Sequence, residues 1–339
     1  MSRPLISVIM AAYNAERFVG EAVRSIQEQT YTNWEMICVD DCSTDGTYEI
    51  LRSLAHGDSR MTVLNNETNM GAALTRNRAI HEAQGDLIAI QDADDISMSY
   101  RLAESLGLLG DSDVVGSDAY TIDQESRRIG YYRTGWDPDR YSALDWLMRG
   151  KHLYLHSTML LRRLALPTPP YNDLPPMEDY DTKLRMAVAG AVFVKGKRPL
   201  AMGRSIREAR EGKMTTQRAF EGYFAKLAAQ QAAMCALAGE PFSYDLCITQ
   251  LQQDPTHVAA AHLRAGWIAL REGAVYSARG HLAEAVRARE TRRAAIVLRV
   301  VAYCPSPLRE TLTELLYTTA QGSHRSHFTI DRDTGGTRR

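Results

Sequence analysis

The sequence lacks a hydrophobic run long enough to cross a bilayer. The apolar segments at residues 5–13 and 294–303 are short, and Arg299 interrupts the second. A membrane-spanning helix needs about 20 apolar residues. The N-terminus also shows no signal-peptide cleavage pattern, so we expect a cytoplasmic protein.

The sequence also lacks closely spaced cysteine pairs and a large net charge. The five cysteines include no C-x-x-C pair, which argues against a zinc site or a disulfide framework. The formal net charge of −1 argues against nucleic acid as a partner. Acidic residues outnumber basic ones in residues 1–200, and the reverse holds in residues 201–339. A basic C-terminal half is typical of solvated helix faces or of contact with an anionic partner.

The 339 residues are 45% hydrophobic and 24% charged, a balance typical of globular proteins with one or two cores. The patterning changes from alternating strands and helices to almost pure helix. We therefore expect one domain over residues 1–214, a helical domain over residues 215–320 and a flexible tail over residues 321–339.

The first region predicts a mostly parallel sheet covered by helices, because short β-rich runs alternate with helical patterns. The strands are expected at residues 5–10, 35–39, 61–64 and 87–90. Ser43 or Thr44 is expected to cap the helix that follows the second strand. Gly85 is expected to close the helix before the fourth.

Acidic residues follow two of the predicted strands. Asp40 and Asp41 end the second strand, and Asp92, Asp94 and Asp95 follow the fourth. Since loops at the carboxyl ends of parallel strands share one edge, five carboxylates would converge there and would favour a divalent cation such as Mg²⁺ or Mn²⁺. The chain has no P-loop and no G-x-G-x-x-G motif. Taken alone, however, a D-x-D segment is as often a solvated acidic loop.

Several motifs together are more specific, and their order and spacing resemble those of family 2 glycosyltransferases. They extend over about 200 residues and include Ser7–Asn14, Ser25-Ile26, Gln29-Thr30, Val39–Thr47, Asn69-x-Gly71, Arg76-Asn77, Gly85-Asp86, Asp92–Asp95, His156–Thr158 and Glu178–Asp181.

The resemblance implies a GT-A fold and an inverting sugar transfer from a nucleotide-sugar donor, typically a UDP-sugar, with Mn²⁺ or Mg²⁺. It assigns the nucleotide-sugar site to Ala11, Tyr13, Asp41, Arg76, Asp92 and Ala93. In this assignment Asp41 accepts a hydrogen bond from the base. Asp94 is the main metal ligand, and Asp92 lies nearer the ribose or a bound water.

By the same resemblance, Asp179 is the catalytic base, with Glu178 and His156 binding the acceptor or supporting the site. A carboxylate within hydrogen-bond reach can take the proton of the attacking hydroxyl. The alternative for Glu178 and Asp179 is an acidic first turn that interacts with a helix dipole. His156 and Tyr13 could equally be structural.

One segment departs from the family pattern. Many relatives carry an aromatic-Arg-x-His type of sequence after the base helix, whereas this chain has Met202–Arg207 without histidine. Arg204 or Arg207 would then supply positive charge to the phosphates, and a third protein ligand for the metal is in doubt.

The helical region contains a pattern similar to one tetratricopeptide-type hairpin, around Ala261–Ala269 and Ala278–Ala285, and a final amphipathic helix near Leu308–Leu316. Five arginines surround the last apolar segment: Arg287, Arg289, Arg292, Arg293 and Arg299. One hypothesis is peripheral contact with an anionic membrane, and the other is a dimer or partner surface.

Three function classes compete at this point. The first is the glycosyltransferase, whose acceptor would be a glycan or a lipid-linked glycan of surface polysaccharide biosynthesis. The second is a phosphatase with Asp92 as nucleophile, which Ile96 and the position after the fourth strand disfavour. The third is a degenerate sugar-nucleotide fold that binds partners through its helical half, which the intact Asp41, Asp94 and Asp179 disfavour.

Overall fold

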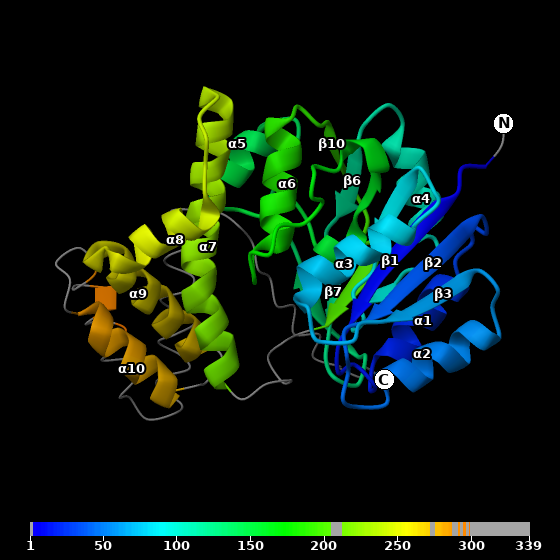
Figure 1. Cartoon of the computed structure of the whole chain (residues 1–339), viewed down its shortest axis with the longest axis horizontal. Coiled ribbons are helices and arrows are strands. Elements are labelled where there is room, and N and C mark those ends of the chain that lie inside the picture. The colour runs from blue at the N-terminus through cyan, green and yellow to red at the C-terminus, as the bar shows by residue number, and fades with distance from the viewer. Residues whose placement is uncertain are drawn as a thin grey trace, which may run out of the picture. The chain divides into compact units, whose positions relative to one another are not determined.

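The computed structural model describes residues 3–204, 212–271, 275–286, 291, 294, 295 and 298 (Figure 1). These residues form two compact units. The first contains residues 3–173 and 182–204, and the second contains residues 174–181 and those described from 212 onward. No helix in the described ranges combines the length and the apolar character that crossing a membrane requires.

A seven-stranded, mostly parallel sheet forms the centre of the first unit, in the order β10-β6-β9-β4-β1-β2-β3. Only β9 runs antiparallel to its neighbours. The strands are β1 (Ile6–Ala12), β2 (Trp34–Asp40), β3 (Met61–Asn65), β4 (Leu87–Ile90), β6 (Val114–Ser117), β9 (Leu160–Arg162) and β10 (Phe193–Gly196). The predicted α/β fold class is therefore confirmed, and the three neighbouring parallel strands β2, β1 and β4 end at the same edge of the sheet.

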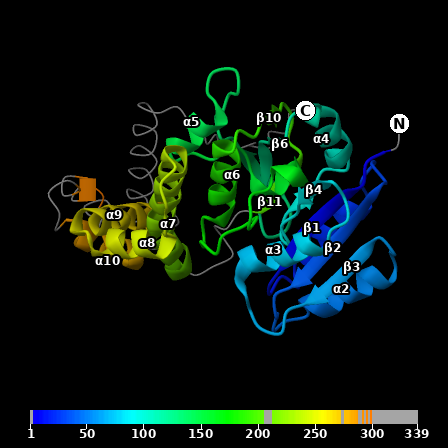
Figure 2. The same ribbon diagram turned by 45° about the horizontal axis from the view of Figure 1, so that its top comes forward.

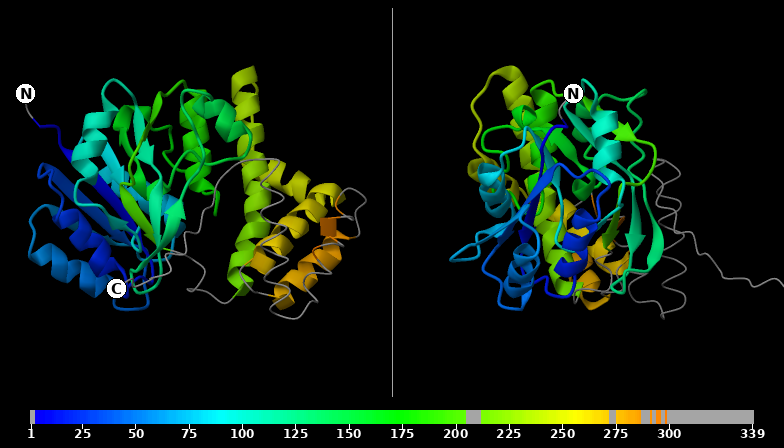
Figure 3. Two further views of the ribbon diagram at one scale, coloured as in Figure 1. Left: turned by 180° about the vertical axis from the view of Figure 1, so that it is seen from behind. Right: turned by 90° about the vertical axis from the view of Figure 1, so that its right-hand side faces the viewer.

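Helices lie on both faces of this sheet (Figure 3). They are α1 (Val19–Gln27), α2 (Thr47–His56), α3 (Gly71–Glu82) and α4 (Arg101–Leu109). Strand β1 is apolar along almost its whole length because both of its faces are buried. On one face, Ile6, Val8 and Met10 pack with residues of α1 in a single hydrophobic cluster. Helix α3 contacts β1 and β2.

Two of the predicted helix boundaries are wrong. Helix α2 begins after Gly46 without a side-chain cap, because the carboxylate of Asp45, not Ser43 or Thr44, accepts hydrogen bonds from the amide and hydroxyl of Thr47. Helix α3 ends before Ala83, not at Gly85. A Cβ at Gly85 would lie 2.5 Å from the carbonyl oxygen of Leu5, so this glycine permits close backbone packing.

A second, four-stranded sheet was not predicted. Its order is β5-β11-β7-β8, with β5 (Ile96–Ser97), β7 (Ala119–Ile122), β8 (Arg128–Tyr132) and β11 (Ala201–Arg204). The first unit also contains the helix α5 (Ala143–Met148) and two short 3-10 helices, η1 (His156–Thr158) and η2 (Arg163–Ala165). Strand β5 follows the acidic loop after β4 directly, so the small sheet fixes the far end of that loop.

The second unit is helical. Its helices α7 (Gly212–Ala238), α8 (Tyr244–Gln253), α9 (Pro255–Arg271) and α10 (Val275–Ala285) lie side by side (Figure 2). Helices α9 and α10 form a hairpin around Ala269, Ala278 and Leu282. The five arginines of the basic segment, the expected helix near Leu308–Leu316 and the tail from residue 321 lie outside the described residues.

Helix α6 (Glu178–Val188) begins in the second unit and ends in the first. Its first turn is acidic, with Glu178, Asp179 and Asp181, and the amide of Asp181 bonds the carbonyl of Met177. The backbone therefore continues from one unit into the other through the residues predicted to include the catalytic base.

Candidate functional site

The acidic loop, residues 92–95, accepts hydrogen bonds from the buried amide side chain of Gln91 at the end of β4. Gln91 donates from Nε2 to the carbonyl oxygens of Asp92 (3.0 Å) and Asp95 (2.8 Å). Its Oε1 accepts hydrogen bonds from Ser97 (2.6 Å) and Arg101 (3.0 Å). Since Gln91 is buried, these bonds give the loop one defined conformation.

Arg101 places a buried positive charge close to the acidic loop. Its guanidinium donates to the carbonyl oxygens of Ile90 (2.6 Å) and Met159 (3.1 Å) in addition to Gln91. Burial lowers the pKa of Arg101 to about 10, and the negative charges of Asp92 and Asp95 oppose that shift. At neutral pH Arg101 therefore stays protonated and offsets part of the acidic charge. The sequence analysis missed this residue.

Asp95 points into the protein. Its carboxylate accepts hydrogen bonds from the Ser157 hydroxyl and from the backbone amide of Arg204 (2.8 Å). Burial, followed by the charges of Asp94 and Asp92, raises the pKa of Asp95 well above its usual range. Asp95 thus anchors the loop to η1 and β11 and is not a group open to a ligand.

Three of the five carboxylates expected to converge are buried and accept hydrogen bonds from the protein. Asp95 is buried, and Asp40 is 1% exposed and accepts from the amide of Ser43 (2.9 Å). Asp41 is also buried, at 3% exposure. Asp94 is exposed and Asp92 is partly exposed, so these two remain at the edge of the sheet. Buried Ala93 lies between them.

Asp92 and Arg76 form an ion pair, with 2.9 Å between Oδ1 and Nη2. Arg76 lies on α3, which packs against β1 and β2. Both side chains are only partly exposed, so solvent screens the pair less than a surface ion pair. The structure thus brings together two residues that the sequence analysis assigned to the nucleotide-sugar site.

Asp41 fixes the start of α3. One carboxylate oxygen accepts from Asn66 Nδ2 (2.7 Å) and the Met70 amide (2.8 Å), and the other accepts from the Gly71 amide (2.8 Å). A carboxylate has about four acceptor positions. Three are satisfied by these protein donors, which leaves room for one further donor such as a nucleobase N–H.

Ala11 and Tyr13 lie at the end of β1, beside β2 and β4. Ala11 is partly buried, and Tyr13 is 50% exposed. The following residue, Asn14, has a φ of +48° and accepts a hydrogen bond from the Thr44 amide (2.8 Å). The loops after β1 and β2 are therefore tied together, and the exposed ring of Tyr13 is not core packing.

His156 is buried beside Tyr171. Its Nε2 lies 3.1 Å from the Tyr171 hydroxyl, and the two rings pack edge to face at 5.7 Å between centroids. The Arg76 guanidinium lies 5.7 Å from the centroid of the Tyr171 ring. His156 is therefore connected through Tyr171 to the ion pair of Arg76 and Asp92, in a supporting position. The sequence analysis missed Tyr171, which no motif marks.

Glu178 and Asp179 lie in the second unit, where the residues around them are basic and aromatic. Lys226 of α7 lies with its Nζ 5.2 Å from the centroid of the Tyr180 ring. Burial, followed by the charge of Arg264, lowers the pKa of Lys226 to about 8, and the charge of Asp179 opposes that shift. The approach of Asp179 to the donor residues stays a prediction.

Arg204 is buried against the acidic loop, and its Nε donates to the Asp94 carbonyl oxygen (2.9 Å). Its guanidinium donates to the Asp123 carbonyl oxygen (2.6 Å) and pairs with Glu21 (3.2 Å). The guanidinium carbon also lies 4.2 Å from the centroid of the Phe18 ring, and the side chain is only 2% exposed. The positive charge of Arg204 therefore lies beside the acidic loop, and its action on a phosphate stays a prediction. Arg207 lies outside the described residues.

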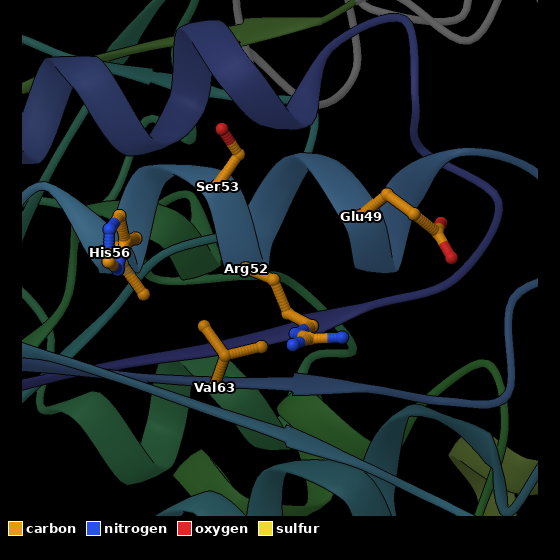
Figure 4. Close-up of a pocket in the computed structure, with 6 residues that line it drawn as sticks. Glu49, Arg52, Ser53, His56 and Val63 are labelled. Atoms are coloured by element: carbon orange, nitrogen blue, oxygen red, sulfur yellow. The ribbon is translucent and has the colours of Figure 1, made fainter.

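A separate hollow of about 640 Å³ lies along α2 and β3 (Figure 4). It is lined by Glu49, Arg52, Ser53, Ala55, His56 and Val63. None of the predicted site residues lines it, so it is not part of the candidate site.

Comparison with known proteins identifies relatives of the first unit. Residues 7–167 match the model of the family described as glycosyl transferase family 2. TuaG of Bacillus subtilis (strain 168), a protein assigned to teichuronic acid biosynthesis, is 47% identical over 93 residues, which cover 27% of this chain and 37% of TuaG. The chain spans about two fifths of the length of the first curated relatives that it matches.

Two solved structures share the fold at low sequence identity. S. aureus TarS 1-349 in complex with UDP-GlcNAc has a TM-score of 0.56 at 17% identity, over 93% of this chain and 92% of that chain. The mannosyltransferase PcManGT of Pyrobaculum calidifontis, in complex with GDP-Man and Mn²⁺, has a TM-score of 0.55 at 20% identity, over 96% and 89%. The predicted GT-A type of fold with a helical C-terminal part is therefore confirmed.

Proposed function

We propose that this chain, whose residues 7–167 match the model of glycosyl transferase family 2, transfers a sugar from a nucleotide-sugar donor to a hydroxyl of a glycan or lipid-linked acceptor. The proposed process is surface polysaccharide biosynthesis, which the relationship to TuaG supports. The proposed catalytic domain covers residues 1–214, with a helical domain over residues 215–320 and a tail over residues 321–339.

The observation that carries the proposal is the acidic loop after β4. Its conformation is fixed by Gln91 and Arg101, and Asp92 is paired with Arg76 at the edge where β1, β2 and β4 end. Ligands of open α/β sheets bind outside the carboxyl ends of the strands. A fixed loop with a carboxylate and a guanidinium at that edge suits a phosphorylated ligand.

The proposed donor site combines the three neighbouring strand ends. Asp41 would accept a hydrogen bond from the base, and Ala11 and Tyr13 would line the base and ribose pocket. Asp92 and Ala93 would lie near the ribose and diphosphate, with Arg76 beside them. We favour a UDP-sugar, and the UDP-GlcNAc complex of a protein with the same fold supports that choice.

The residues of the acidic loop fit a divalent cation. Asp94 is exposed, Asp92 is partly exposed, and only Ala93 separates them in the sequence. Carboxylate oxygens are the ligands that Mg²⁺ and Mn²⁺ prefer. Asp94, with Asp92 next to it, would hold the ion, which when bound neutralises charge on the diphosphate. The Mn²⁺ complex of PcManGT supports this proposal.

The proposed mechanism is a single inverting displacement. Asp179 takes the proton of the acceptor hydroxyl while the hydroxyl oxygen bonds to the anomeric carbon of the sugar. The bond between that carbon and the diphosphate oxygen breaks on the opposite face, and the nucleoside diphosphate leaves. Glu178 would bind or orient the acceptor, and His156 would support the site through Tyr171.

Calorimetric titration with UDP, GDP, dTDP and CDP, each with and without Mn²⁺, tests the donor site. Metal-dependent binding of one nucleotide, weakened by Asp94→Asn, is the expected result. Asp111→Asn is the matched control, since Asp111 is an exposed carboxylate outside the acidic loop. If a correctly folded protein bound none of the four nucleotides, the proposal would fail in favour of a partner-binding protein with a degenerate site.

A further inference from the structure

The small sheet carries a group of basic and aromatic side chains that the proposed function does not use. We name it the Arg–Tyr surface, and it consists of Tyr100, Tyr120, Tyr131, Arg128, Arg133, Lys197 and Arg198. The four basic residues are exposed, and the three tyrosines are partly exposed.

Each arginine of the Arg–Tyr surface lies against a tyrosine ring. The distances from the guanidinium carbon to the ring centroid are 3.5 Å for Arg198 over Tyr100 and 4.4 Å for Arg128 over Tyr120. The distance is 4.9 Å for Arg133 over Tyr131. Such stacking restricts a long side chain, so less entropy is lost when its N–H groups bind an anion.

The tyrosines also contact one another. Tyr120 and Tyr131 are cross-strand partners on β7 and β8, and their rings meet edge to face at 5.6 Å between centroids. Because these residues share one face of the sheet, their arginines are brought together on that face. Arg198, from the turn before β11, adds a third guanidinium.

A hollow of about 300 Å³ lies at one end of the surface. It is lined by Asp118, Tyr131, Arg133, Gly135, Trp136 and Lys197. Lys195 pairs with Asp118 at 2.8 Å and so neutralises the carboxylate of the hollow. Arg133 and Lys197 therefore leave the hollow positively charged.

The positive charge of the whole surface exceeds its negative charge. Besides Asp118, the acidic residue described in contact with it is Glu104, which lies 3.2 Å from Arg198. Arg128, Arg133, Lys197 and Arg198 carry four positive charges, and Lys195 compensates Asp118. A positive surface of this kind attracts anionic ligands over a distance of about a Debye length.

The Arg–Tyr surface is on the opposite face of the small sheet from the acidic loop. A Cβ at Gly203 would lie 2.9 Å from Leu155 and 3.9 Å from Asp95, so Gly203 of β11 faces the loop. Its neighbour Met202 pairs with Tyr120 across the ladder, and side chains alternate between faces along a strand. Tyr120 and Tyr131 therefore face away from the acidic loop.

We propose that the Arg–Tyr surface binds an anionic glycan chain, with carboxylate or phosphodiester groups on the guanidinium groups and one sugar unit in the hollow. Guanidinium groups match carboxylate and phosphate oxygens in pairs, and tyrosine provides an apolar ring with a polar end for a sugar. The choice of a glycan over another polyanion rests on the proposed function. A flat bilayer surface would not fill the hollow.

Fluorescence anisotropy with labelled oligosaccharides tests this surface. The probes are an oligogalacturonate, which carries carboxylates, an oligomer of glycerol phosphate, which carries phosphodiesters, and a neutral malto-oligosaccharide of similar length. We expect one of the anionic probes to bind, with an affinity that falls as salt concentration rises, and the neutral probe to bind at least about tenfold more weakly.

The double variant Arg133→Gln with Lys197→Gln should weaken binding of the anionic probe by about tenfold or more. The control, Arg24→Gln with Arg52→Gln, changes the net charge equally on the exposed faces of α1 and α2. Its affinity should stay near that of the wild type. Melting temperatures of both variants check that the fold is intact.

Three results would overturn the proposal. They are equal binding by the double variant and the wild type, equal binding of the neutral probe, and binding of phosphatidylglycerol vesicles without binding of either anionic oligosaccharide. The same variants are titrated with the nucleotide that the wild type binds. A wild type that binds no nucleotide would contradict the proposed function, whereas a wild type that binds a nucleotide but neither anionic oligosaccharide would contradict this surface alone.

Discussion

The first unit buries charged and amide side chains, whereas the described part of the second unit buries mainly alanine. Arg101, Asp95 and Gln91 are almost fully buried around the acidic loop, and each forms several hydrogen bonds. In the second unit the fully or nearly fully buried side chains are mostly those of alanines on α7, α9 and α10. The first unit thus holds polar groups in fixed positions, and the second allows helices to approach closely.

The buried side chains therefore serve different purposes in the two units. A buried polar network is stable only if each member has its hydrogen-bond partners. Such a network fixes a loop conformation, and removal of one member strongly lowers the free energy of unfolding. Small apolar side chains carry little chemistry but let helices pack tightly. Asp179, in the first turn of α6, is the proposed catalytic residue of the alanine-rich unit.

The largest expected effect tests the proposed role of Asp179, a residue of the second unit, as catalytic base. Asp179→Asn should lower kcat for sugar transfer by about 10²–10⁴-fold, because the base is lost, while nucleotide binding is retained. Single-turnover transfer assays and nucleotide titration measure the two effects. Asp173→Asn, at an exposed position nearby, is the control. Normal transfer by Asp179→Asn would show that another group is the base.

The next effect tests the buried charge of the first unit. Arg101→Met should lower the free energy of unfolding by about 3–5 kcal/mol, because it removes a buried positive charge that interacts with Asp92 and Asp95 and removes four hydrogen bonds. Urea unfolding measures the change. Arg149→Met, at an exposed arginine, should stay within about 0.5 kcal/mol of the wild type. Similar stability of both variants would contradict the role of the buried charge.

Lys226 is a partly buried charge of the second unit, and it predicts a pH dependence. Its pKa is lowered to about 8 in the folded protein, against 10.5 for the ordinary side chain. Between these values the unfolded chain binds more protons, so the stability of the second unit should rise with pH, by about 3 kcal/mol at most.

Lys226→Met should remove this rise, which urea unfolding over the same pH range measures. Lys197→Met, at an exposed lysine, should retain it. A rise that persists in Lys226→Met would assign the pH dependence to another group.

The smallest effect compares packing in two helices. A Cβ at Gly266 of α9 would lie 2.6 Å from Cγ of Leu282, which is fully buried on α10. Gly266→Ala should therefore destabilise by about 1–3 kcal/mol, the range for overpacking. Gly107→Ala in α4 meets open space and should stabilise by about 0.5–1 kcal/mol through helix propensity. Melting temperatures that move in the same direction would contradict the contrast.

The central sheet could be predicted from sequence because its strands are long apolar runs separated by amphipathic helices. The small sheet could not, since β5 has two residues and β8 is exposed or only partly buried, so neither gives a recognisable period. Asp41, Asp92 and Arg76 could be found through motif spacing. The hydrogen-bond partners of the acidic residues could not be predicted, because the bonds of Asp41 to Asn66 and of Asp95 to Arg204 join residues far apart in sequence.

The residues around His156 show the same limit. A sequence pattern indicates that a histidine is present, but its role depends on Tyr171, fifteen residues away, and on the ring that Arg76 reaches from α3. The position of Glu178 and Asp179 in the second unit was also not predictable, because α6 continues without a break from one unit into the other.

Helix α3 sets the spacing between the positions proposed for the base and for the diphosphate of the donor. Asp41 holds its first residue, Gly71, and Arg76 lies five residues further along, a rise of about 7.5 Å. Because a helix is rigid, the distance along α3 from Gly71 to Arg76 is fixed. The distance between the positions proposed for the base and for the diphosphate would then be fixed as well. The proposed site would therefore select a donor by the distance between its base and its diphosphate as well as by their chemistry. A residue inserted in the first turn of α3 would change this distance without removing any group that touches the ligand.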